Sequence, residues 1–306
     1  MQSLWMLVAS FLFSIMGVCV KLASDYYSTA EIVAFRGLIG MAMILALVKL
    51  QGGTLRTSMP SHHLWRGMIG VVSLWMWFFA ITKLPLATAV TLNYMSPIWI
   101  AVILFATAWW QGKKRADMGL IAAVALGFAG VVLLLRPSMQ ADQMLGGIIG
   151  LASGMLAALA YLQVRQMGLM GEPEYRVVFY FSATCFMAGM LGAVLTGGVS
   201  AAQNMSDWHH HGIKSFLLLL VIGFTAASAQ IAMTRAYRLG NTLVTANLQY
   251  VGIVFSSAWD VLLWHDVLKW QSWLGIAVIL ASGLTATFYN AKNNKPVVAS
   301  DPIGSE

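Results

Sequence analysis

The sequence predicts an all-α integral membrane protein with ten transmembrane helices, arranged as two inverted five-helix repeats. Three observations support this prediction: the composition, the spacing of long apolar segments, and a repeat between the two halves. Of the 306 residues, 59% are hydrophobic and only 9% are charged. A soluble domain carries about 25% charged residues. A chain with so little charge cannot hide its apolar surface by folding on itself, so we expect the lipid bilayer to surround it.

The basic balance of the chain does not indicate nucleic-acid binding. The formal net charge is +7, but the basic residues stand singly between apolar runs. That pattern is typical of membrane loops, and we expect no nucleic-acid partner. Cys19 and Cys185 lie inside apolar segments. They are expected to pack as small apolar side chains and not to form a disulfide framework.

Apolar windows of about 20 residues follow one another along the whole chain. They cover residues 3–22, 31–50, 65–82, 86–109, 117–135, 146–165, 177–196, 215–234, 242–264 and 271–290. Short polar turns separate them. Inside a bilayer the backbone must satisfy its own hydrogen bonds, so we expect each window to be a helix.

The distribution of Lys and Arg predicts the orientation. Twelve of the 18 basic residues fall at the even-numbered connections and the C-terminal tail, and six fall on the opposite side. Cytoplasmic loops carry an excess of Lys and Arg. Both termini are therefore predicted to be cytoplasmic.

The two halves of the chain repeat each other. Residues 80–96 (AITKLPLATAVTLNYMS) match residues 236–252 (AYRLGNTLVTANLQYVG) at a constant offset of 156. Five spans per half is an odd number, so the second half enters the membrane from the opposite side. We divide the chain into a first repeat at residues 1–140, a second repeat at 141–291 and a cytoplasmic tail at 292–306. Inverted repeats are typical of secondary transporters, whose substrate site lies near the midplane between the halves.

Four segments resemble the EamA branch of the drug/metabolite transporter superfamily. They are AFRG around Arg36, the hairpin at residues 80–97, ANLQYVGIVFSSAWDVLLWHD at 246–266 and GIAVILASG at 275–283. The resemblance implies a basket of two inverted halves in a bacterial inner membrane. It also implies a small-molecule substrate that moves through a central cavity by alternating access. Export of an amino acid or related metabolite is the leading expectation, and uptake of a vitamin-like or nucleoside-like molecule is the alternative.

The ninth predicted span carries a stripe of polar and small residues. Its members are Thr242, Thr245, Gln249, Gly252, Ser256 and Asp260. At 100° per residue a continuous helix would place them within an arc of about 80°. A polar stripe facing lipid would be costly, so we expect it to face a cavity. Hydrogen bonding between packed helices is the alternative.

The fourth predicted span carries a shorter version of this stripe. Asn93 and Gln249 each lie seven residues into their spans from opposite faces of the membrane. That depth is about 10 Å at 1.5 Å per residue, so the two amides should bracket the midplane. We expect Asn93, Ser96 and Gln249 to contact substrate.

Residues next to these amides are expected to shape the cavity. Helical phase places Tyr94 and Tyr250 about 100° from the stripe, as walls beside it. Pro97 removes one backbone hydrogen bond and predicts either a gating hinge or a static kink.

Four further side chains complete the predicted cavity. They are Ser14 in the first span, Trp75 in the third, Tyr161 in the sixth and Gln230 in the eighth. Trp75 and Trp77 point about 160° apart, so at most one of them faces the cavity. Around Ser14 and Tyr161, the alternative interpretation is close packing of small residues. For Gln230, the alternative is interhelical hydrogen bonding.

Asp260 and Arg36 are the ionisable residues most clearly inside predicted spans. Charge within the membrane is a functional hypothesis by default. Asp260 either carries a coupling proton or pairs with Arg36, and both residues are candidates for coupling or gating.

No pattern predicts a catalytic, metal or cofactor site. The histidines fall in loops or at span ends, and we interpret the run at residues 209–211 as a solvated loop. The chain contains no phosphate-binding glycine motif. We therefore expect no enzyme activity, metal or cofactor. A membrane-embedded enzyme, or a receptor that carries no flux, are the competing hypotheses.

Overall fold

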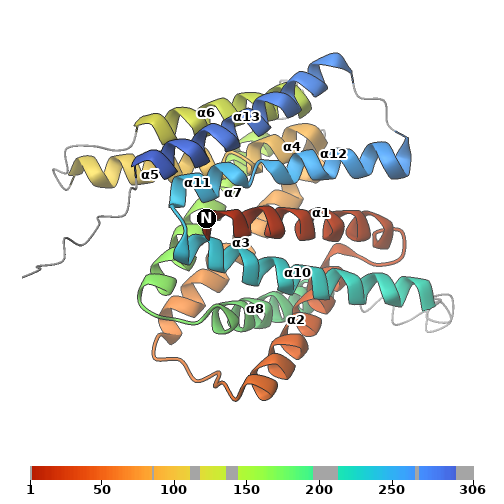
Figure 1. The fold of residues 1–306 in the computed structure, drawn as a ribbon. Helices are drawn as coiled ribbons and strands as arrows, with labels where there is room; N and C mark the ends of the chain where they lie inside the picture. Colours follow the sequence, from red (N-terminus) through yellow and green to blue (C-terminus); the bar gives the residue numbers. More distant parts are fainter. Residues whose placement is uncertain are drawn as a thin grey trace, which may run out of the picture.

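A computed structural model describes residues 2–84, 86–110, 118–135, 144–195, 213–265 and 269–293. The described residues are all-helical and include no strand (Figure 1). Helices occupy every one of the ten predicted windows. Eight of the described helical segments are long and apolar enough to cross a membrane. The all-α prediction is confirmed, and the structure is consistent with an integral membrane protein.

The helices of the first half begin after a short 3₁₀ turn at Gln2–Leu4. They are α1 (Trp5–Ala23), α2 (Thr29–Gln51), α3 (Pro60–Lys83), α4 (Leu86–Asn93), α5 (Ser96–Trp110) and α6 (Met118–Leu135). A capping box of Ser28 and Glu31 starts α2, and Gly52 ends it in the left-handed conformation at φ 66°. The turn residues before and after α2 thus fix its boundaries.

The second half repeats the pattern of three long helices, two shorter ones and a final long one. They are α7 (Met144–Leu169), α8 (Glu174–Leu195), α10 (Ile213–Leu239), α11 (Thr242–Leu248), α12 (Val251–Trp264) and α13 (Trp270–Asn293). Many outward side chains on these helices are large and apolar; Leu191 and Leu284 are each 60% exposed. Such a surface suits contact with lipid chains.

The fourth and ninth predicted spans are each two short helices. The first break lies at residues 94–95, between α4 and α5, and the second at 249–250, between α11 and α12. The 156-residue offset places residues 94–95 on residues 250–251, so the two breaks coincide to within one residue. At both breaks the backbone tightens to an i→i−3 bond: Met95 N–H donates to Leu92 O and Gln249 N–H to Ala246 O, each at 3.2 Å.

These breaks correct one expectation. The ninth span is not a continuous helix, so the predicted single stripe is interrupted at Gln249. Pro97 lies just after the first break, in the first turn of α5. The second break has no proline, so proline is not the cause that the two breaks share.

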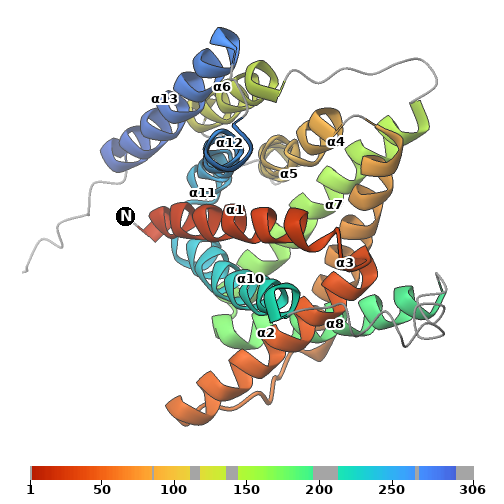
Figure 2. The ribbon, with the colours of Figure 1, turned by 90° about the vertical axis from the view of Figure 1, so that its right-hand side faces the viewer.

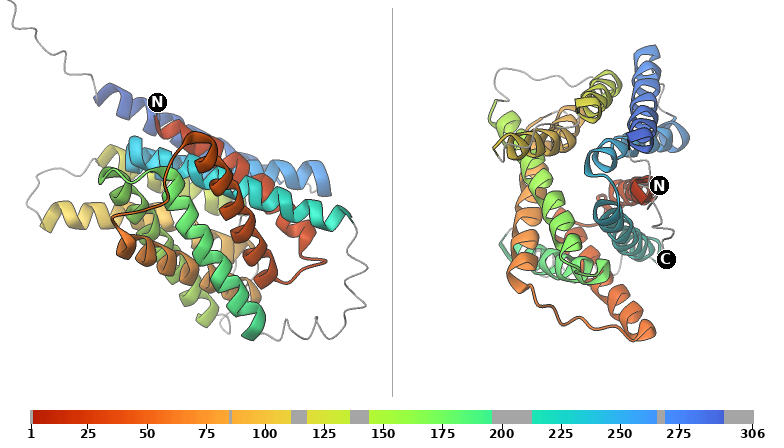
Figure 3. Two further views of the ribbon diagram at one scale, coloured as in Figure 1. Left: turned by 90° about the horizontal axis from the view of Figure 1, so that it is seen from below. Right: turned by 60° about the vertical axis from the view of Figure 1, so that its left-hand side comes forward.

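The most extensive helix contacts join the two halves of the chain. They pair α2 with α8, α6 with α13, α1 with α10, and α3 with α7. Figure 2 shows α6 and α13 together at one end of the molecule and α2 and α8 at the other. The views in Figure 3 agree that α1, α3, α7 and α10 lie between these ends. The predicted polar residues are therefore carried mainly by the middle layer and the broken helices beside it.

Candidate functional site

The first break places the Asn93 amide against α7. Asn93 is the last residue of α4, and its Nδ2 donates to Ser153 Oγ at 3.3 Å. The Ser153 hydroxyl donates to Gly150 O at 2.7 Å. From α3, Ser73 Oγ donates to Ser153 O at 2.9 Å. Three helices thus converge on Ser153, which is fully buried.

The second break places the Gln249 amide between two tyrosines. Gln249 Nε2 donates to the Tyr161 hydroxyl on α7 at 3.3 Å, and Gln249 Oε1 accepts from the Tyr237 hydroxyl on α10 at 3.4 Å. The two tyrosine rings stack with centroids 5.6 Å apart and planes 12° apart. Tyr237 was not among the predicted site residues. It lies three positions after the apolar window at residues 215–234, where one tyrosine carries no distinctive signal.

Helix α7 connects the two amides. Asn93 contacts it at Ser153 and Gln249 contacts it at Tyr161, eight positions later in the sequence. Eight residues of helix span about 12 Å. The two residues that the sequence repeat superimposes therefore face the same helix near the middle of the molecule, and this polar cluster is the candidate site.

The neighbouring tyrosines point to other helices. Tyr250 is fully buried against α6, with its ring 6.4 Å from that of Phe128, and its hydroxyl has no hydrogen-bond partner among the described residues. Tyr94 is partly buried in the same apolar cluster. The Tyr94 hydroxyl approaches Gly252 on α12. A Cβ built on Gly252 would lie 3.4 Å from this hydroxyl oxygen.

Ser14 and Trp75 contact neighbouring helices, and Ser96 is buried. Ser14 Oγ accepts from Trp259 Nε1 at 3.0 Å, which ties α1 to α12. Ser96 is buried at the start of α5. Trp75 is 37% exposed and packs against Gly192 of α8.

Asp260 does not pair with Arg36, which was one of the two alternatives that the sequence left open. The Asp260 carboxylate lies 3.7 Å from the Lys21 ammonium at the end of α1, and both side chains are about half exposed. The sequence could not reveal this partner, because Lys21 lies 239 positions away on a helix that packs against α12 only in the folded protein.

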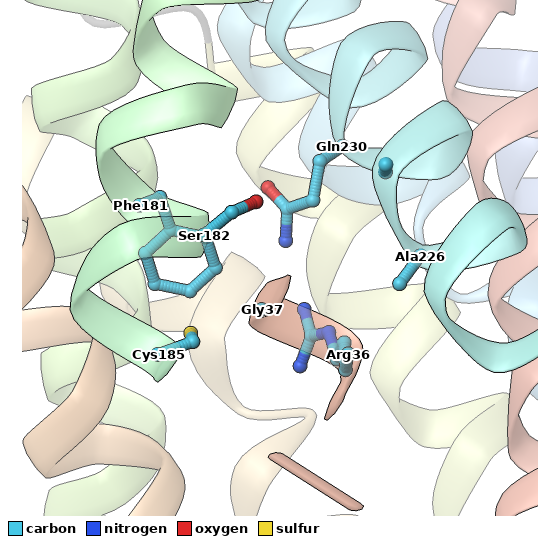
Figure 4. Close-up of a pocket in the computed structure, with 8 residues that line it drawn as sticks. Arg36, Gly37, Phe181, Ser182, Cys185, Ala226 and Gln230 are labelled. Carbon is cyan, nitrogen blue, oxygen red and sulfur yellow. The ribbon is translucent and has the colours of Figure 1, made fainter. Parts of the chain in front are cut away.

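Arg36 instead faces Gln230 across a small cleft between α2, α8 and α10. Figure 4 shows both side chains pointing into the cleft, with Ser182 and Cys185 beside them. The Arg36 guanidinium lies 5.9 Å from the centre of the Phe181 ring. The cleft has room for about one water molecule.

Arg66 was missed as a site residue. It was counted as a cytoplasmic charge at the edge of a span, yet it is only 3% exposed. Its guanidinium lies 4.1 Å from the centre of the Phe181 ring, so Phe181 contacts two arginines. A single basic residue at a span end looks like an ordinary orientation signal.

A second buried polar cluster was also missed. His63 is 3% exposed and its Nε2 lies 2.9 Å from Glu172 Oε1 in the turn between α7 and α8. Arg176 lies 3.5 Å from the other carboxylate oxygen of Glu172. Among the described residues no group of three His, Cys, Asp or Glu could hold a metal ion. The triple histidine at 209–211 lies outside the described residues.

Fold and site together define a multi-pass helical membrane protein with hydrogen-bonding groups inside its helix bundle. The profile of the EamA-like transporter family matches residues 1–136. The pseudopaline exporter CntI of Pseudomonas aeruginosa is 32% identical over 262 residues, which is 85% of this chain and 86% of that one. The chain therefore belongs to the EamA-like transporter family, and the resemblance to the drug/metabolite transporter superfamily is confirmed.

More distant proteins agree with this class. The riboflavin transporter of Vibrio cholerae is 23% identical and covers 96% of this chain and 95% of its own. Human solute carrier family 35 member G1 is 23% identical and covers 92% of this chain and 77% of its own. A protein of known crystal structure, 19% identical, superposes with a TM-score of 0.79 over 96% of this chain and 99% of that chain, which shows the shared fold.

Proposed function

We propose that this protein is a secondary active transporter that carries a small organic metabolite across the membrane by alternating access. One observation supports this most: the two amides that the sequence repeat superimposes, Asn93 and Gln249, both hydrogen-bond to α7 from equivalent breaks in two helices. Broken helices that meet near the midplane are typical of transporter substrate sites.

The ten helical segments are proposed to be ten transmembrane spans in two inverted repeats. The helix contacts support this arrangement. The proposed relation pairs each helix of the first half with its equivalent in the second: α1 with α7, α2 with α8, α3 with α10 and α6 with α13. If each helix is exchanged with its equivalent, the contact between α1 and α10 becomes the observed contact between α7 and α3. The contacts between α2 and α8 and between α6 and α13 are unchanged. Such an exchange is expected of a pseudo-two-fold axis between the halves.

Export of an amino acid or related metabolite from the cytoplasm is the proposed direction and substrate class. We place the protein in a bacterial inner membrane with both termini cytoplasmic, as the twelve-to-six distribution of basic residues favours. The name of the pseudopaline exporter supports export. Uptake of a vitamin-like molecule is the second candidate, because a riboflavin transporter is also a relative.

The substrate is proposed to contact Asn93, Gln249 and Tyr161. Amides and a hydroxyl offer donors and acceptors, while stacked aromatic rings offer an apolar wall. Asp260 is the proposed carrier of a coupling proton. Protonation would remove its charge and weaken its contact with Lys21, which links that step to the packing of α12 on α1.

Reconstitution into liposomes tests this proposal. Purified protein is assayed for flux of labelled amino acids, nucleosides and vitamins, with and without a proton gradient. We expect flux of at least one compound, with loss of the gradient effect in Asp260→Asn. Absence of flux for every compound under both conditions contradicts the proposal.

A further inference from the structure

Arg66 is a buried charge that has no counter-charge among the described residues. It is the seventh residue of α3, about 10 Å along that helix. Its Nε and Nη1 have no hydrogen-bond partner among the described residues. No described carboxylate lies within 4.0 Å of it, and its guanidinium lies over the ring of Phe181.

Arg36 contributes a second guanidinium next to the same ring. It approaches from α2, on the far side of the cleft from Gln230 of α10. Arg36 likewise has no carboxylate within 4.0 Å among the described residues. Both guanidiniums lie within electrostatic range of the Tyr161 hydroxyl on α7.

Two adjacent unpaired cations inside a helix bundle are costly, because each has lost its hydration and each repels the other. Glu172, in the turn before α8, is already engaged by His63 and Arg176. A guanidinium presents a planar fork of donors that matches a carboxylate. Ser182 and Gln230 add neutral hydrogen-bonding groups to the cleft that Arg36 and Phe181 line.

We propose that Arg36 and Arg66 form an anion site that binds the carboxylate group of the transported substrate. This inference rests on the proposed transport function and narrows its substrate class to small carboxylic acids, amino acids included. Phe181 holds the two guanidiniums near one another, and the rest of the substrate extends toward Tyr161 and Gln249. The bound carboxylate supplies the negative charge that the described residues around the pair lack.

Ligand-dependent thermal unfolding of the purified full-length protein tests this site. The probes are acetate and L-leucine, each compared with its carboxamide, acetamide or L-leucinamide, at constant ionic strength; inorganic phosphate is a separate arm. We expect the two carboxylates to raise the melting temperature and the two amides to have no effect. Equal shifts with acid and amide, a shift with phosphate alone, or no shift at all would each overturn the proposal.

Variants locate the effect. Arg36→Gln and Arg66→Gln are expected to raise the carboxylate concentration for a half-maximal shift at least 100-fold. Arg66→Lys keeps the charge but loses the fork, so a smaller increase of about 10-fold is expected. If Arg66→Gln does not fold, the Arg66→Lys variant still shows whether Arg66 takes part in carboxylate binding. Arg56→Gln, an equal charge change in the exposed loop before α3, is the matched control and should behave like the wild type. An unchanged half-maximal concentration in Arg66→Lys and Arg36→Gln overturns the proposal.

The outcome separates the two claims. Carboxylate-induced stabilisation that requires both arginines, without flux of any compound, keeps the anion site and contradicts transport. Flux of compounds that all lack a carboxylate, without carboxylate-induced stabilisation, keeps transport and contradicts the anion site.

Discussion

At the scale of single residues, Gln249 ties the second break to α7 and α10, because its amide bonds to a tyrosine of each helix. Gln249→Leu keeps the approximate size of the side chain but leaves both tyrosine hydroxyls without this partner. A buried hydroxyl that loses its partner costs about 1–3 kcal/mol, so kcat/KM should fall roughly 10- to 100-fold. Initial flux rates in liposomes measure this change. Gln51→Leu, at the exposed end of α2, is the matched control, and an equal loss in both variants would contradict the assignment.

His63 and Glu172 predict a pH dependence of stability outside the predicted span, which begins at residue 65. Burial lowers the pKa of His63 below its ordinary value of 6.5, more than the bond to Glu172 raises it. Burial raises the pKa of Glu172. Hydrogen bonds from His63 and Thr57 oppose this effect and outweigh it, so the pKa of Glu172 is below its ordinary value of 4.5. For both groups the unfolded chain binds more protons than the folded one, so stability falls as pH drops below about 6.5.

The melting temperature should therefore be lower at pH 5.5 than at pH 7.5. His63→Gln removes the titrating ring, and we expect it to reduce that difference. His62→Gln changes the adjacent, half-exposed histidine and serves as the control. A wild-type melting temperature that does not change between these pH values would show that the His63–Glu172 pair is not a source of acid sensitivity.

Sequence patterns identified some of these residues and missed others for a physical reason. Asn93 and Gln249 were identified because a polar amide deep in an apolar window needs a polar partner. Arg66 and His63 were missed because they lie near the start of a window, where polar residues normally face water. Their burial depends on Phe181 and Glu172, which are more than 100 positions away in the sequence.

At the scale of elements, the close approach of α2 and α8 depends on glycine. A Cβ added to Gly37 would lie 2.5 Å from the backbone nitrogen of Phe186, and backbone cannot move aside as a flexible side chain can. Gly37→Ala is therefore expected to destabilise the protein by about 1–3 kcal/mol and to lower its melting temperature. Gly17→Ala in α1 is the control, because no atom of the described residues lies within 4 Å of its added Cβ. A Gly37→Ala variant as stable as Gly17→Ala would contradict this close packing.

The boundaries of most helices followed from the apolar windows, but the two breaks did not. Apolar content continues through residues 94–95 and 249–250, so composition alone predicts one long helix in each place. The offset of 156 marked both positions as equivalent. The shift to i→i−3 bonds there is a backbone property that residue types did not reveal.

At the scale of the whole molecule, the central claim is that a site near the midplane opens to each side of the membrane in turn. Two observations support this claim. The contacts between the two halves are those expected of the proposed two-fold relation, and Asn93 and Gln249 both hydrogen-bond to α7. A fixed channel or a static receptor would not need two equivalent broken helices around one polar cluster.

Accessibility of residue 249 from each side of the membrane tests this claim most directly. The native Cys19 and Cys185 are buried and are first replaced by alanine, and Gln249→Cys then provides the one thiol. A membrane-impermeant thiol reagent is applied to right-side-out and to inside-out vesicles. The account predicts labelling in both orientations, slowed in both by the transported compound. Labelling from one side only, whatever the compound and gradient, would contradict alternating access.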